Sequence, residues 1–130
     1  MHTTARVLEA LTNTNERLIA MTNQLRGREE SSRVTHEMHL RGYRNGPTIE
    51  FYVYAKLKNG RGPCWCLEID WNEDKWIIRS SVVFNQEGEE ETFREFPERI
   101  AKCVDEVIVE LDEATTALVA SSDCFDHFTH

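Results

Sequence analysis

Four segments in the middle of the chain alternate apolar and polar side chains, the pattern of strands with one buried face. They run over about 33–41, 48–58, 63–71 and 75–84. Short turns separate them, including Asn59-Gly60, whose sequence is typical of a tight β-hairpin. Because short connections place consecutive strands side by side, we expect an antiparallel meander.

Two amphipathic helices are predicted, one before the strands in the sequence, over residues 4–26, and one after them, over residues 97–120. In the first, Leu11, Leu18 and Leu25 share one stripe, and Gly27 is placed to end the helix. In the second, Pro97 suits the first helical position. Residues 85–92 are interpreted as a polar, Glu-rich loop, and residues 121–130 as a tail without a clear pattern.

The 130 residues are therefore expected to form a single α+β domain, 1–130, with the element order α-β-β-β-β-α. Each strand has an apolar face that needs a cover, and only the two helices can provide it. Both helices should lie on the same face of a four-stranded sheet. The other face should meet solvent or a partner.

The uncovered sheet face is a candidate binding surface, because Tyr and Arg combine a large contact area with a polar tip. The strand positions that form it are Thr35, Glu37, His39, Arg41, Glu50, Tyr52, Tyr54, Lys56, Cys64, Cys66, Glu68, Asp70, Ile77, Arg79, Ser81 and Val83. Cross-strand pairs of these residue types also stabilise solvated sheets, so a purely structural interpretation competes.

The acidic charge is concentrated near the end of the chain. The net charge is −8; residues 1–84 carry 12 basic and 10 acidic side chains, whereas residues 85–113 carry 3 and 11. This excess argues against binding nucleic acid or an anionic membrane through that segment. It favours attraction to a basic partner, although a solvated, solubilising helix face would explain it as well.

The candidate catalytic groups do not form a recognised arrangement. Cys64 or Cys66 with His39 would make a dyad, but no third group orients it and no oxyanion loop precedes either thiol. Glu68 and Asp70 share one strand face, where Arg79 and Lys56 predict ion pairs rather than acid–base catalysis. We therefore expect no enzyme activity.

A metal site is a weaker candidate still. Cys64 and Cys66 are separated by one residue, and Cys124 with His127 resembles half of a zinc site. Structural zinc usually takes two half-sites with longer Cys spacing, so no metal or other cofactor is expected. The first residues lead into a patterned helix with internal Glu9 and Glu16 rather than a signal peptide, which predicts a cytoplasmic protein with reduced thiols.

The segment from about 48 to 118 resembles the small bacterial α+β immunity proteins of polymorphic toxin and conflict systems. The resemblance lies in the run from Cys64 to Trp71, the Trp76-Ile77-Ile78 start of the next strand, the Glu-rich loop, the run from Phe96 to Ile100, and the Leu-Asp-Glu-Ala of the last helix. It is a pattern of residue types, so no functional residue carries over. It implies a cytoplasmic protein that neutralises a toxin by binding it.

These observations predict a non-enzymatic protein-binding domain, immunity- or inhibitor-like, that uses its acidic helix face or its open sheet face. The partner is expected to be a protein, with a basic one favoured, and neither nucleic acid nor a membrane. The alternative is a small acidic chaperone or adaptor for a secreted or effector client, which would be a homodimer. The candidate contact residues are Tyr52, Tyr54, Lys56, Glu68, Asp70, Arg79, Glu89, Glu90, Glu91, Asp105, Glu106 and Glu110.

Overall fold

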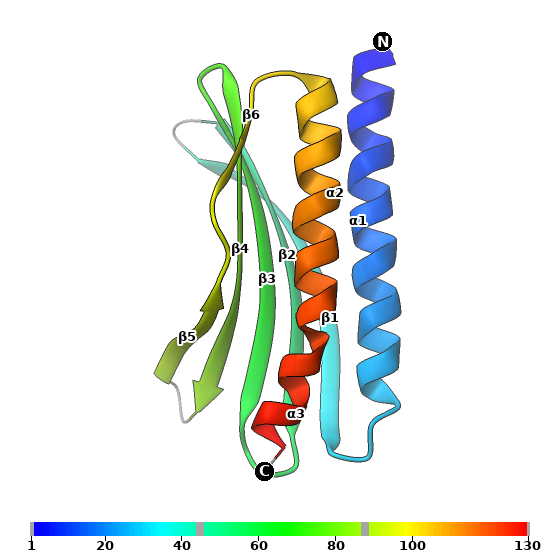
Figure 1. The fold of residues 1–130 in the computed structure, drawn as a ribbon, viewed down its shortest axis with the longest axis vertical. Coiled ribbons are helices and arrows are strands. Elements are labelled where there is room, and N and C mark those ends of the chain that lie inside the picture. Colours follow the sequence, from blue (N-terminus) through cyan, green and yellow to red (C-terminus); the bar gives the residue numbers. More distant parts are fainter. Residues whose placement is uncertain (1, 44–45, 87–88, 130) are drawn as a thin grey trace.

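The computed structural model describes residues 2–43, 46–86 and 89–129 and places them in one α+β arrangement (Figure 1). Four long antiparallel strands follow in the predicted order, β1 (Ser31–Tyr43), β2 (Gly46–Leu57), β3 (Gly62–Asn72) and β4 (Lys75–Gln86). Two short strands, β5 (Glu89–Glu95) and β6 (Arg99–Ala101), both pair with β4. The antiparallel α+β fold is confirmed, but the predicted number of four strands is wrong, since the sheet has six.

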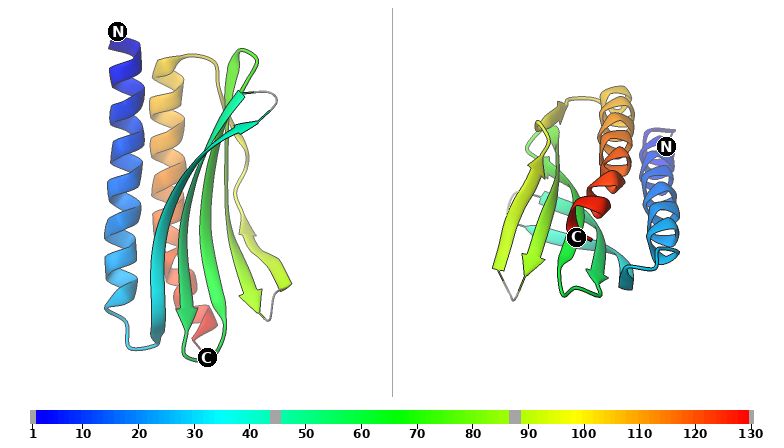
Figure 2. Two further views of the ribbon diagram at one scale, coloured as in Figure 1. Left: turned by 180° about the vertical axis from the view of Figure 1, so that it is seen from behind. Right: turned by 60° about the horizontal axis from the view of Figure 1, so that its bottom comes forward.

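Helices α1 (His2–Arg26) and α2 (Val104–Ala120) lie side by side on one face of this sheet (Figures 1 and 2). Polar contacts join them: the Thr14 and Thr115 hydroxyls lie 2.9 Å apart, and Arg17 donates to Asp112 at 3.0 Å. The inward strand positions fill the core as the alternation predicts, and Trp65 and Phe51 are fully buried there.

The sequence interpretation fails at the predicted loop and at the start of the predicted second helix. Residues 89–95 are all exposed, so β5 has no alternation to reveal it; it forms because β4 continues to Gln86 and offers an unpaired edge. Pro97 does not begin a helix. It lies between β5 and β6, and α2 begins at Val104, after Cys103 in an extended conformation.

The tail, in which the sequence showed no clear pattern, continues α2 as a 3₁₀ turn, η1 (Ser121–Asp123), and a short helix, α3 (Cys124–Phe128). Phe125 and Phe128 are buried, and the Phe128 ring stacks on Phe84 with centroids 4.9 Å apart. The Trp65 indole N–H donates to the Ser121 carbonyl oxygen at 2.9 Å. The tail therefore closes the end of the core where β3 begins.

Candidate functional site

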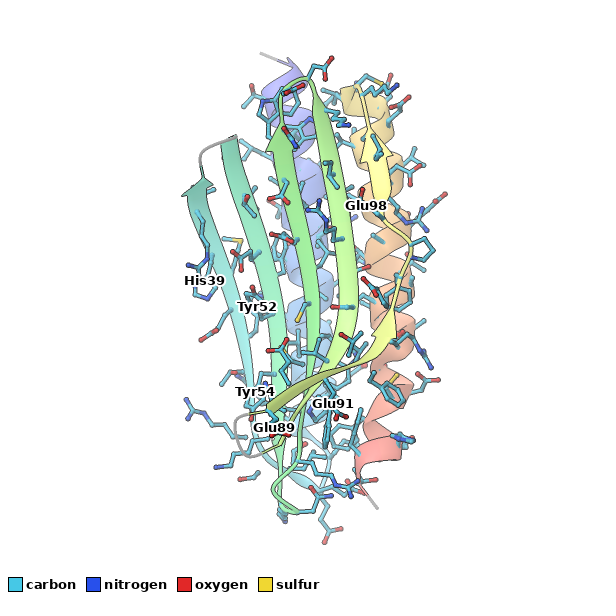
Figure 3. All side chains as sticks on the ribbon, turned by 90° about the vertical axis from the view of Figure 1, so that its left-hand side faces the viewer. His39, Tyr52, Tyr54, Glu89, Glu91 and Glu98 are labelled. Atoms are coloured by element: carbon cyan, nitrogen blue, oxygen red, sulfur yellow. The ribbon has the colours of Figure 1, made fainter. Side chains whose placement is uncertain are left out.

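The sheet face turned away from the helices carries the polar strand positions, as predicted (Figure 3). The strand register places them in rows across the sheet. One row runs through Glu37, Tyr52, Cys66 and Ser81. The next runs through His39, Glu50, Glu68 and Arg79. This face is therefore a continuous polar surface built by four strands.

Strand β5 changes this surface, because it crosses in front of the sheet near the ends of β3 and β4 (Figure 3). Cys64 and Val83, predicted to be open to solvent, are each only 8% exposed. Their cross-strand neighbours explain this burial, since Cys64 lies opposite Val83, which lies opposite Thr92 of β5. The face is thus not a flat open sheet but a sheet with one wall.

A groove of about 390 Å³ lies on this face. We call it the acidic groove; its lining comprises Tyr52, Cys66, Leu67, Glu68, Arg79, Ser80, Ser81, Val83, Glu90, Glu95, Phe96 and Glu98. Among the described residues, four of these are glutamates and one is basic. Glu90 and Glu95 come from β5, and Phe96 and Glu98 from the connection to β6. The groove therefore has a carboxylate-rich rim around a single guanidinium.

Arg79 is the centre of charge on the sheet side of the acidic groove. It donates to Asp70 through a short contact and to the Glu98 carboxylate at 3.0 Å, and Glu68 lies 4.0 Å away. Partial burial, reinforced by the nearby Asp70 carboxylate, raises the pKa of Glu68 above its ordinary value. One arginine thus neutralises part of the charge of three carboxylates, and the site remains negative. Glu68 and Asp70, considered above as a catalytic pair, belong to an ion-pair network centred on Arg79.

Glu50 is the most buried carboxylate of this face, at 7% exposure. Its carboxylate accepts a hydrogen bond from the Tyr52 hydroxyl and forms an ion pair with Arg41, whose Nε lies 2.7 Å from Glu50 Oε1. The Tyr52 ring also contacts His39, with centroids 5.9 Å apart. Burial and the bond to Glu50 raise the pKa of the Tyr52 hydroxyl. Tyr52 is therefore held in place as a rigid, protonated hydroxyl beside the acidic groove.

The predicted contact carboxylates fall into two classes. Those on α2 are engaged within the molecule: Asp105 pairs with Arg6, Glu110 lies 2.8 Å from Arg99, and Glu106 accepts the backbone N–H of Lys102 at 2.6 Å. Much of the acidic helix face is thereby accounted for by folding.

The glutamates on β5 differ. Glu89, Glu90, Glu91 and Glu95 are exposed, and no ion pair joins them to a basic side chain within the described part of the chain. Figure 3 shows Glu89 and Glu91 where β5 crosses the sheet. We call these four residues the β5 glutamates. Glu95 was missed by the sequence interpretation, because only the pairing of β5 with β4 brings it to the acidic groove.

The remaining predicted contact residues lie on β2. Lys56 is exposed on the open face, and its backbone pairs with Arg33 of β1. Tyr54 lies over the start of β3, so closely that a Cβ on Gly62 would come within 2.6 Å of its hydroxyl oxygen. Neither side chain lines the acidic groove, although Tyr52 of the same strand does.

The thiols do not assemble into a reactive site. The Cys66 and Cys64 sulfur atoms lie 3.7 Å apart, and that contact together with burial raises the pKa of Cys64, so its thiolate is disfavoured. Strand β2 lies between these cysteines and His39 on β1. Cys124 is buried in the core and His127 packs against Phe93, so the two half-sites considered for zinc lie on different sides of the sheet.

No protein-family model, no curated protein and no solved structure matches this chain. In the part of the chain that the structure describes, no helix is both long and apolar enough to cross a membrane. The acidic groove and the β5 glutamates are the surface features on which a functional proposal can rest.

Proposed function

We propose that this protein is a non-enzymatic binding domain, inhibitor- or immunity-like, that recognises a basic segment of a protein partner through the acidic groove and the β5 glutamates. The single observation that carries the proposal is the contrast between the two acidic regions. The α2 carboxylates discussed above are engaged inside the molecule, whereas the four on β5 are exposed without an ion pair among the described residues.

Ion pairs within the described part of the fold do not account for the β5 glutamates. Like charges placed close together on one exposed strand repel each other and lower stability. A basic partner would relieve that repulsion and would gain charge-assisted hydrogen bonds to the carboxylates. The groove beside them offers a surface for the rest of the contact, with Tyr52 fixed by Glu50 and Phe96 among its lining residues. Rigid aromatic side chains of this kind are favoured in protein interfaces.

The proposal predicts the kinetics of binding. A cluster of unpaired surface charges steers an oppositely charged partner and speeds association, in a way that salt screens. Replacing Glu89, Glu90, Glu91 and Glu95 by Gln keeps the shape of each side chain and removes four charges. Association with a basic partner should then slow by about tenfold or more at low salt.

The control removes the same number of charges elsewhere. Glu9→Gln, Glu16→Gln, Glu73→Gln and Asp74→Asn also change four exposed carboxylates, on α1 and on the β3–β4 turn. Both variants and the unmodified chain would serve as baits for affinity capture, and association rates with the captured protein, once purified, would be measured at several salt concentrations.

Capture that is lost with the β5 variant and kept with the control supports the proposal. A partner whose binding is independent of salt and of the β5 charges contradicts it. The inhibitory aspect is tested by co-expressing the chain with its partner: relief of the partner's toxicity or activity by the unmodified chain, but not by the β5 variant, is the expected result.

A further inference from the structure

Strand β1 forms the edge of the sheet opposite β5, and two large apolar side chains on it are exposed. Met38 is 56% and Leu40 is 75% exposed, although both lie on the inward face of the strand, in line with the buried Val34. The reason is geometric: β1 starts beside α1 and diverges from it toward its end, so the helix covers only the first half (Figures 1 and 2). The second half of the edge therefore combines apolar side chains with a strand that pairs on one side only among the described residues.

The backbone groups that face outward along this edge can be identified. Lys58 N–H donates to the Glu30 carbonyl oxygen, which fixes the hydrogen-bonding phase at the start of β1. After the register shift before Arg33, the backbone N–H and C=O of Val34 point away from β2. Arg26 Nε donates to the Val34 carbonyl oxygen at 2.9 Å, as expected for a carbonyl that faces outward. Because the orientation alternates along a strand, Met38 and Leu40 also present their N–H and C=O groups outward, beyond the reach of that arginine.

We propose that this half of β1 pairs with β1 of a second copy of the chain, antiparallel and centred on His39. A two-fold axis at His39 sets Met38 opposite Leu40 of the second copy, and Leu40 opposite its Met38. The two outward-pointing residues of each strand then exchange backbone hydrogen bonds, and the exposed apolar side chains cover each other.

The same register matches charge on the other face of the strand. It sets Glu37 opposite Arg41 of the second copy, twice in the pair. Arg41 is half exposed and already lies 2.7 Å from Glu50, so it would bridge two carboxylates, and Glu37 is 62% exposed. Opposite charges directly across strands stabilise a pairing, and a shift of the register by two residues would lose both matches.

The other edge is unsuited to pairing with itself. The β5 glutamates would place like charges against each other, which is how edge strands are commonly protected from association. Since β1 and β5 are at opposite edges, the proposed dimer leaves both acidic grooves open. Success or failure of the dimer is therefore independent of the proposed binding function.

The first test measures mass in solution with the full chain, by light scattering after size exclusion and by sedimentation. The expected result is a species of twice the 15.2 kDa chain mass. Leu40→Lys should weaken the dimer by about tenfold or more. It should leave the thermal midpoint unchanged only at dilutions where both proteins are monomeric, because the side chain is exposed in the monomer. Leu8→Lys is the matched control on α1, where the leucine is 57% exposed, and should leave the dimer intact.

The second test reads the register directly. In a Cys103→Ser background, His39→Cys places two thiols across the axis at the short Cα distance of a non-hydrogen-bonded pair, which a disulfide can span. Mild oxidation should link this variant into a covalent dimer much faster than Lys58→Cys on an exposed turn. A monomer at concentrations up to about 100 μM, a dimer indifferent to Leu40→Lys, or equal cross-linking of the two cysteine variants would each overturn the proposal.

Discussion

The substitution Tyr52→Phe removes one hydroxyl and tests whether side-chain hydrogen bonds on the polar sheet face stabilise the fold, or whether this face is simply solvated. The hydroxyl donates to Glu50, a carboxylate that is 7% exposed and is also held by Arg41 at 2.7 Å. A hydrogen bond to a charged group contributes about 1.5–3 kcal/mol, and the remaining arginine places the loss near the lower end, about 1.5 kcal/mol. For a chain of this length that corresponds to a fall in thermal midpoint of about 5 °C.

Tyr54→Phe is the matched control. It deletes the same atom from the same strand face, and no hydrogen bond joins that hydroxyl to another group within the described residues. We expect a change below about 0.5 kcal/mol in its free energy of unfolding, measured by urea denaturation. Equal destabilisation by the two substitutions would refute the reasoning.

The pH dependence gives a second readout of the same bond. Burial and the bond to Glu50 raise the pKa of Tyr52 in the folded state. The stabilisation that the Tyr52 hydroxyl provides is therefore complete below the pKa that this tyrosine has in the unfolded chain, and it is lost as the pH rises above that value. The unfolded chain begins to release this proton near pH ~10, so the advantage of the unmodified chain over Tyr52→Phe should shrink by about 1.4 kcal/mol per pH unit above that. A difference that stays constant from neutral pH to pH ~11 would contradict the assignment.

Further predictions concern local backbone and thiol chemistry. Gly46→Ala should cost about 2 kcal/mol or more, because φ is 139° there and a Cβ would lie 2.6 Å from the Trp71 carbonyl oxygen; Gly42→Ala, with open space around it, should be nearly neutral by urea denaturation. Cys103→Ser should raise stability by about 0.5–1 kcal/mol, since Cys103 precedes α2 in an extended conformation without a side-chain cap; an unchanged midpoint would count against this. The same substitution should abolish the fastest phase of reaction with a thiol reagent, whereas buried Cys64, whose pKa is raised by its neighbouring thiol and by burial, should react slowly in both proteins.

Periodicity predicted the first helix and the four long strands because each buries one face, and burial leaves a regular trace in the sequence. Leu18 and Leu25 of α1, and Phe51 and Val53 of β2, lie in the core where their spacing placed them. The uncovered sheet face followed from the same alternation, as did the position of Arg79 beside its two acidic neighbours on β3.

Elements that bury little, or that depend on a distant neighbour, left no such trace. Strand β5 is exposed at every residue, and it forms by pairing with the second half of β4, on the edge that β3 does not occupy. Pro97, placed by local preference at a helix start, lies instead in a connection whose next residues pair with β4 and delay α2 to Val104. The acidic groove is lined in part by β5 and by the connection from β5 to β6. The groove could therefore not be predicted from the alternating pattern of the four long strands.

The sequence by itself thus determined the fold class, the acidic character and the sheet face that the helices leave uncovered, because amphipathic periodicity and net charge are local or additive properties. Tertiary structure decided which carboxylates are engaged by folding and which remain exposed without an ion pair among the described residues. It also decided which half of β1 the helix leaves uncovered. Ion pairs such as Arg6 with Asp105 join residues about a hundred positions apart, and only the packing of α1 against α2 brings them together.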